Sequence, residues 1–194
     1  MRAVAIISVM GLAMLLGAVA APQEADEPTQ VVFIGEDEQG TVWVNLSLAL
    51  QNQDDAYLPM VIGVQNKAHN QIKLTRESFW LSDLDGVIYT MPSVKEWRKY
   101  YKRIVIDRRL LSTGGIPWEV WWRSGRFSPS NFFPDLRSNR SSTTRDSIVL
   151  RNGYGMVDLM YFEQLRSNQI GRPFILTVHP KGWEVPIRIR LHLS

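Results

Sequence analysis

The chain has 194 residues, a formal net charge of +3 at pH 7 and no cysteine. Without thiols it cannot form disulfides, cysteine nucleophiles, iron–sulfur clusters or thiolate metal sites, and its length suits one domain with a core of its own. The charges are segregated: residues 22–66 contain eight acidic residues and no Lys or Arg, whereas residues 95–145 contain twelve basic and four acidic residues.

This asymmetry has two explanations. The first is a cationic face that meets an anionic partner, such as phospholipid headgroups, an acidic polymer or an acidic protein. The second is that the charges only solvate loops and helix faces, or pair with the acidic N-terminal segment of the same chain.

Residues 1–20 have the form of a secretory signal peptide. Arg2 precedes a short apolar run, and the small residues that end in Ala18-Val19-Ala20 supply an A-x-A cleavage site. The alternative is an uncleaved anchor, with a run near the lower limit of about 20 residues for crossing a bilayer. We expect a secreted or periplasmic protein, with residues 21–28 as a disordered lead-in and residues 29–194 as a single domain. In that compartment we expect no nucleic-acid partner and no cofactor.

Short strands separated by turns are predicted along the first part of the domain. Thr29–Ile34 is the first strand, and apolar residues alternate over Thr41–Leu50 and again from Leu58 to Val64. Gly63 interrupts the last of these and indicates a bulge or a close backbone contact. Further strands are predicted at residues 71–74, 78–82 and 87–90. Strands spaced about 8–12 residues apart predict an antiparallel sandwich or barrel.

A helix is predicted to interrupt the strands after Ser93. Ser93 and Glu96 fit a capping box, in which the serine accepts a hydrogen bond from a free amide and the glutamate reaches back. Apolar residues follow at helical spacing, namely Val94, Trp97, Tyr101 and Ile104. The remaining surface is made cationic by Lys95, Arg98, Lys99, Lys102 and Arg103. The pattern predicts an amphipathic basic helix.

This helix opens an insertion at about residues 93–145. A second, shorter helical turn is predicted from Pro117 to Gly125, because proline favours the first turn of a helix and glycine follows its end. Residues 127–145 have no usable periodicity, and a stretch of that length is uncommon unless it is functional or mobile. Strands are predicted to resume at residues 147–150, 156–162, 173–179 and 185–193.

Residues 57–89 follow an order of strands and turns that is met in a known class of domain. The motifs in that order are Val64-Gln65-Asn66, Ile72-Lys73-Leu74, Ser78-Phe79-Trp80-Leu81, Asp83-Leu84-Asp85-Gly86 and Tyr89. The stretch resembles secreted bacterial immunoglobulin-like accessory domains. The resemblance implies a mainly β fold, an antiparallel immunoglobulin-like β-sandwich, and a binding or envelope-associated role. It supplies no catalytic residue, and the insertion and the missing cysteine pair depart from it.

The sequence contains no G-x-S-x-G elbow and no H-E-x-x-H metal motif. His69 lies in a predicted turn, His179 at a strand end and His192 on an outer strand face, so we expect surface or structural roles. The segment Asp83–Gly86 has the first elements of a calcium loop but lacks the later glutamate. Because Asp and Gly also favour turns, we expect a hairpin turn there. We therefore predict no metal site.

Paired carboxylates for glycosidase chemistry are an alternative, because such pairs can be remote in sequence. The candidates near aromatic residues are Glu119, Asp158, Glu163 and Glu184. Asp158 could share an apolar strand face with Met160, but we expect the opposite phase, which buries Leu159 and leaves Asp158 exposed. The runner-up hypothesis is therefore a secreted hydrolase that uses a carboxylate near the aromatic insertion.

Aromatic and cationic residues are interleaved in the insertion. They are Trp118, Trp121, Trp122, Phe127, Phe132 and Phe133 with Arg123, Arg126, Arg137 and Arg140. If exposed, the rings would stack on sugars, lie at a membrane surface or form interface hot spots, and the arginines would bind anionic groups. If buried, the rings would attach the insertion to the sheets.

We expect a secreted, non-catalytic binding or envelope-associated protein. Its partner would be an anionic or glycan ligand, an envelope component or another protein, and a membrane surface is a further possibility. The ligand-binding residues are predicted to be Arg98, Lys102, Trp118, Trp121, Trp122, Arg123 and Arg126. A third hypothesis is an adaptor that pairs a strand with a partner along a sheet edge.

Overall fold

The computed structural model describes residues 31–52, 55–107, 109, 126, 132–133, 144–169 and 171–193. The predicted signal peptide, the predicted lead-in and the predicted helical turn at residues 117–125 lie outside the described residues. In the described part, no helix combines the length and the hydropathy that a bilayer crossing requires.

The described residues form ten strands in three antiparallel sheets, so the mainly β prediction is confirmed. The first sheet has the order β1 (Val32–Glu36), β2 (Gly40–Asn45), β3 (Tyr57–Asn66) and β8 (Gly155–Glu163). The second has the order β10 (Ile187–Leu191), β9 (Phe174–Val178), β5 (Phe79–Asp83) and β6 (Ile88–Tyr89). The third pairs β4 (Gln71–Thr75) with β7 (Ser147–Arg151).

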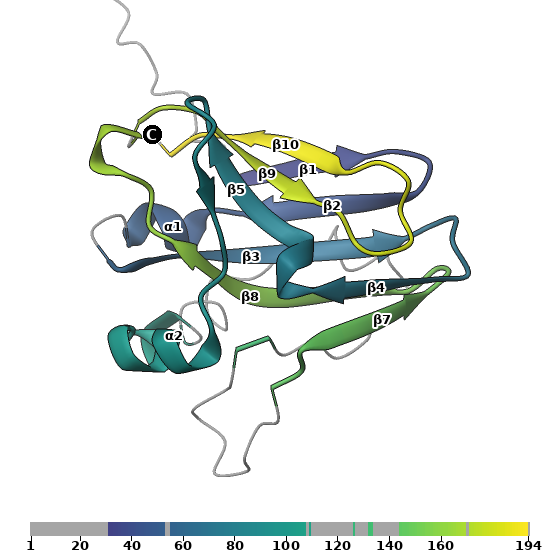
Figure 1. The fold of residues 1–194 in the computed structure, drawn as a ribbon, viewed down its shortest axis with the longest axis horizontal. Helices are drawn as coiled ribbons and strands as arrows, with labels where there is room; N and C mark the ends of the chain where they lie inside the picture. The colour runs from purple at the N-terminus through teal and green to yellow at the C-terminus, as the bar shows by residue number, and fades with distance from the viewer. Residues whose placement is uncertain are drawn as a thin grey trace, which may run out of the picture.

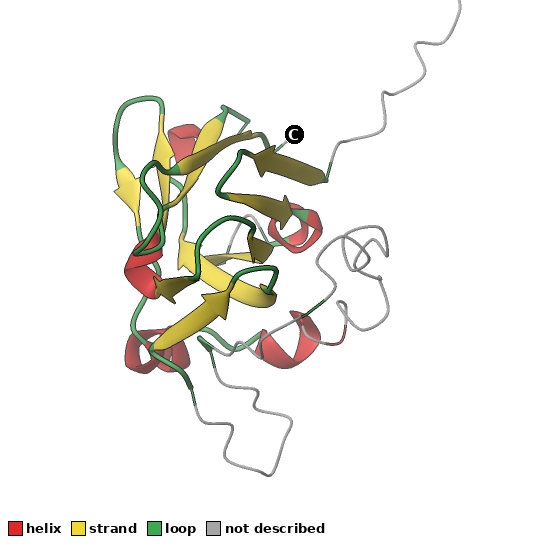
Figure 2. Cartoon of the chain, turned by 90° about the vertical axis from the view of Figure 1, so that its right-hand side faces the viewer, coloured by secondary structure: helices red, strands yellow, loops and turns green. Residues whose placement is uncertain are grey.

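The β4–β7 pair joins the two larger sheets at one end (Figure 1). β4 continues through the 3-10 turn η1 (Arg76–Ser78) into β5 of the second sheet, whereas β7 turns back at residues 152–154 into β8 of the first. On another side β1 lies beside β10, and the side chains of Ile187 and Ile189 come within 2.8 Å of the place that a Cβ on Gly35 would occupy. The helices lie around the outside of the strands (Figure 2).

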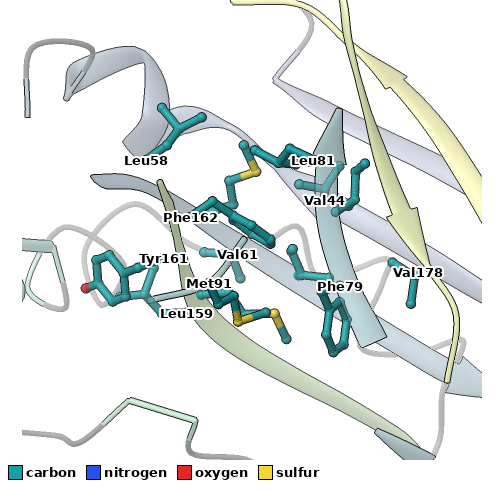
Figure 3. Close-up of a cluster of buried hydrophobic side chains, with 14 of the residues drawn as sticks. Val44, Leu58, Val61, Phe79, Leu81, Met91, Leu159, Tyr161, Phe162 and Val178 are labelled. Atoms are coloured by element: carbon teal, nitrogen blue, oxygen red, sulfur yellow. The ribbon is translucent and has the colours of Figure 1, made fainter. Parts of the chain in front are cut away.

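The core lies between the two larger sheets and receives side chains from both (Figure 3). Leu58 and Phe162 come from the first sheet, and Phe79, Leu81 and Val178 come from the second; all five are buried. Burial of such side chains supplies the main stabilising free energy in a chain without disulfides.

The alternation predicted for the last strand is confirmed. Ile187, Ile189 and Leu191 of β10 are buried, whereas Arg188 and Arg190 between them are exposed. Successive side chains of a strand point to opposite faces, so a strict alternation identifies a strand with one face in water.

The strand predicted over Thr41–Leu50 is wrong in its second half, because the chain forms helix α1 (Ser47–Gln51) there. The side-chain oxygen of Asn45 accepts hydrogen bonds from the Ser47 amide at 2.8 Å and from the Ser47 hydroxyl at 2.6 Å, which ends the strand. Leu46 and Leu50 are four positions apart, and the Leu50 amide donates to the Leu46 carbonyl at 3.0 Å. An apolar spacing of four fits a helix as well as a strand.

Candidate anion-binding surface

The predicted basic helix is present, but it is shorter than the stretch over which apolar residues recur at helical spacing. Helix α2 spans Val94–Tyr100 and begins with the predicted capping box. The Ser93 Oγ accepts from the Glu96 amide at 3.2 Å, and the Glu96 carboxylate accepts from the Ser93 amide at 3.1 Å. The Glu96 carboxylate also accepts from the Ser93 hydroxyl at 2.7 Å, and this hydrogen bond together with the one from the Ser93 amide lowers the pKa of Glu96. Tyr101 is extended, with φ −103° and ψ 122°, and residues 104–107 form a further helical turn.

The inner side of α2 is held by aromatic residues. Trp97 is fully buried, and its ring centroid lies 5.2 Å from that of Tyr161 on β8 and 5.3 Å from that of Phe133. Tyr101 and Ile104 are also buried, as their spacing predicted. The contact with β8 fixes the helix on the domain, so its outer side is presented in one orientation.

A buried carboxylate lies beneath the same segment, and the sequence patterns did not identify it. Asp107 is fully buried, and its Oδ2 accepts hydrogen bonds from the hydroxyls of Tyr101 and, at 3.2 Å, Tyr161. Its Oδ1 has no hydrogen-bond partner among the residues described. Burial raises the pKa of Asp107, and burial also raises the pKa of Tyr101. Asp107 is the only acidic residue between Glu96 and Glu119, which is the signal that sequence reasoning missed.

The outer side of this region is cationic. We call residues 94–107 the basic segment. Its exposed cations on α2 and just after it are Lys95, Arg98, Lys99 and Lys102. None of these four forms an ion pair with any residue that the structure describes, whereas Arg103 pairs with Asp55 at 3.3 Å. The Lys99 ammonium lies 4.8 Å from the centroid of the Tyr100 ring. Glu96 is the one exposed carboxylate of this segment and Asp107 is buried, so the four exposed cations leave the outward charge positive.

The predicted binding residues are only partly brought together. Arg98 and Lys102 lie on the basic segment, but Arg126 is attached to the turn between β7 and β8. Its carbonyl accepts from the Gly155 amide at 2.8 Å, and its guanidinium lies 5.5 Å from the centroid of the Tyr154 ring. The other four, Trp118, Trp121, Trp122 and Arg123, lie outside the described residues, as do Phe127, Arg137 and Arg140.

Two aromatic residues of the insertion attach it to the sheets. Phe132 and Phe133 are fully buried, and the Phe132 ring lies 6.1 Å from the Phe79 ring of β5. For these two rings the buried alternative is therefore correct. The guanidinium of Arg76 lies 5.9 Å and 5.6 Å from the two ring centroids.

Asp158 corrects the predicted phase of its strand. Its side chain is buried, not exposed, and its Oδ2 accepts from the Phe132 amide at 2.9 Å while its Oδ1 accepts from the Leu159 amide at 2.9 Å. Leu159 is buried as well, because β8 is covered on both faces. A strand that is buried on both faces has no alternation of apolar and polar residues, so its sequence does not show which side chains are exposed. Asp158 therefore holds the insertion through the Phe132 amide.

The remaining candidates have structural surroundings. Asp83 forms the predicted hairpin turn: its Oδ1 accepts from the amides of Asp85 at 3.0 Å and Val87 at 2.8 Å, and its Oδ2 accepts from the Tyr89 hydroxyl at 2.8 Å. No cluster of metal-ligating side chains occurs within the described residues. His69 lies in a turn and His179 directly after a strand, as predicted, whereas His192 is exposed but directly follows the end of β10 instead of lying on its outer face. Glu163 and Glu184 are exposed, and Glu119 lies outside the described residues.

No family model, no curated protein and no solved structure matches this chain.

Proposed function

We propose that this protein is an exported, non-catalytic binding protein that recognises an anionic partner through the basic segment. The observation that carries the proposal is the set of four exposed cations, Lys95, Arg98, Lys99 and Lys102, without ion pairs to described residues on a helix anchored by Trp97. A fixed cationic surface attracts anionic partners and raises their association rate.

The arrangement of charges on α2 supports this proposal. Lys95 lies three positions from Arg98 and four from Lys99, so the three cations are neighbours on one turn. Each like-charged pair at such spacing destabilises a helix by about 0.2–0.5 kcal/mol. The helix retains them because Trp97 is buried against β8, and a bound anion would remove the repulsion.

We also propose that the fold is an immunoglobulin-like sandwich and that residues 1–20 direct export. The support for the first is the pair of four-stranded antiparallel sheets with a common core. Residues 57–89, the stretch that resembles such domains, supply β3 of one sheet and β5 and β6 of the other. The support for the second is the arrangement of Arg2, an apolar run and the A-x-A site. An envelope-associated role follows from the two together.

Among the described residues, no observation favours the hydrolase alternative. Three grooves of the described part have volumes of about 340, 480 and 510 Å³, and none of them is lined by two carboxylates. Glycoside hydrolysis would require a pair about 5–10 Å apart.

The proposal is tested by retention of the purified protein on an immobilised sulfated polysaccharide. The variant carries Lys99→Glu and Lys102→Glu in the basic segment. The matched control carries Arg188→Glu and Arg190→Glu on the exposed face of β10, so its net charge changes equally. We expect the first variant to elute at much lower salt than the wild type and the control to elute close to it. Equal losses in both variants would show that net charge, and not the basic segment, governs binding.

A further inference from the structure

We infer that the partner of the basic segment is the surface of an anionic lipid bilayer, an inference that rests on the proposed function. The additional observation is a group of exposed apolar side chains. Tyr100, Val105 and Ile106 are 56%, 48% and 51% exposed. They are three of the eight large apolar side chains that are exposed in the described part of the chain, and they fall within seven consecutive positions. Exposed apolar groups gathered at one place indicate an interaction site.

The exposed cationic and the exposed aliphatic residues lie in successive parts of the basic segment. The exposed cations cluster on α2 and at Lys102, and the exposed aliphatic residues follow on the turn at residues 104–107. In that turn Ile104 and Asp107 are buried, so the turn is fixed on the domain while Val105 and Ile106 face outward. The outward side chains therefore do not belong to the core.

An anionic bilayer offers both kinds of contact at one boundary. Lipid phosphates attract Lys and Arg, and apolar side chains enter the region between headgroups and acyl chains. The long stems of Lys99 and Lys102 allow their ammonium groups to stay among the phosphates while neighbouring apolar groups go deeper. Tyr100, with an apolar ring and a polar hydroxyl, is a residue type that favours this boundary.

A glycan fits these residues less well. Sugar recognition uses flat aromatic rings, and among the described aromatic residues Tyr100 alone is exposed. Val105 and Ile106 are aliphatic and offer no flat face. A soluble polyanion would meet the cations but would give the aliphatic side chains nothing to contact. The lipid surface is the partner that accounts for both.

The absence of cysteine allows a position-specific test. A single Val105→Cys substitution provides the only thiol of the chain, which can carry an environment-sensitive fluorophore. The control is Val149→Cys on β7, a valine of similar exposure (50%) outside the basic segment. With vesicles of phosphatidylcholine and phosphatidylglycerol, we expect a blue shift for the probe at position 105 and none at position 149. Vesicles of phosphatidylcholine alone should give no shift at either position.

A second experiment separates charge from insertion. The variant with Val105→Ser and Ile106→Ser should bind anionic vesicles about tenfold more weakly in co-sedimentation. It should keep the wild-type retention on the sulfated polysaccharide. The control with Ile88→Ser and Val149→Ser changes two similarly exposed residues elsewhere and should bind vesicles like the wild type. Each cation removed from the segment should weaken vesicle binding about fivefold.

The outcomes distinguish this inference from the proposed function. If the Val105/Ile106 variant binds vesicles like the wild type, or if the wild type ignores anionic vesicles while still binding the polysaccharide, the lipid inference is wrong and the proposed function stands. If the Lys99/Lys102 variant retains its polysaccharide binding, the proposed function itself is wrong.

Discussion

The side-chain amide of Asn66 donates a hydrogen bond to the backbone oxygen of Leu150, 3.1 Å away and 84 positions later in the chain. The same amide donates to the His69 carbonyl at 2.7 Å, and the Asn66 side-chain oxygen accepts from the His69 amide at 3.1 Å. One buried side chain therefore joins the turn after β3 to the end of β7, where the two larger sheets are linked.

We predict that Asn66→Ala lowers the free energy of unfolding by about 2–4 kcal/mol, because buried backbone groups lose their partners. Urea denaturation followed by circular dichroism measures the change. Asn70→Ala alters an exposed asparagine of the same turn and should change the stability by less than about 0.5 kcal/mol. Equal losses in the two variants would contradict the role given to Asn66.

Gly63 is needed because of a side chain on the neighbouring strand. A Cβ at this position would lie 2.1 Å from atoms of the Trp43 indole, the cross-strand partner of Gly63. We predict that Gly63→Ala destabilises the protein by about 1–3 kcal/mol through overpacking. In a Trp43→Leu background the same substitution should have a much smaller effect, because the two residues are coupled. Thermal unfolding of the four proteins tests this, and simple additivity would contradict it.

Asp107 should make stability depend on pH. Burial raises its pKa, which Asp55 raises further, while hydrogen bonds from Tyr101 and Tyr161 and the charge of Arg103 act in the opposite direction. A folded-state pKa above the unfolded value of about 3.9 stabilises the protein while the carboxyl is protonated, and this contribution is lost as the pH rises through the raised pKa. Asn cannot ionise.

We therefore predict that Asp107→Asn gains stability relative to the wild type as the pH rises from about 4 to about 7. Urea denaturation at a series of pH values measures the difference between the two proteins. A difference that stays constant over this range would show that Asp107 has an ordinary pKa in the folded state.

Lys73 and Lys181 are like charges placed directly opposite each other. Their backbones exchange two hydrogen bonds of 2.9 Å, so the two side chains leave the same face. Neither forms an ion pair with a residue that the structure describes. We predict that Lys73→Glu raises the free energy of unfolding by about 0.2–1 kcal/mol. Added salt should reduce the gain, and a Lys73→Gln variant should show about half of it.

The sequence predicts an element well where its pattern allows one structure only. The strict alternation around Arg188 and Arg190 identified a strand with one wet face, and Ser93 with Glu96 identified the start of α2. The spacing of Leu46 and Leu50 fits both a strand and a helix, and the Asn45 turn that decides between them is a local hydrogen bond that periodicity does not record.

The charged residues of the site could be predicted from the sequence, but the buried carboxylates beneath it could not. The cations of the basic segment follow from composition, and Trp97 follows from helical spacing. Asp107 and Asp158 are buried because groups distant in sequence donate hydrogen bonds to them, from Tyr161 and from the Phe132 amide respectively. The sequence alone does not distinguish such a carboxylate from an exposed one, because its hydrogen-bond donors are known only from the structure.

The proposed function depends on the exposed cations of the basic segment binding an anionic partner. The most direct measurement is the dissociation constant for a sulfated polysaccharide at several salt concentrations, for the wild type and for a variant with Lys99→Gln and Lys102→Gln. We expect the wild-type affinity to fall steeply with salt, and we expect the slope of log affinity against log salt to be smaller by about two in the variant. Identical affinities and slopes in the two proteins would contradict the proposed function.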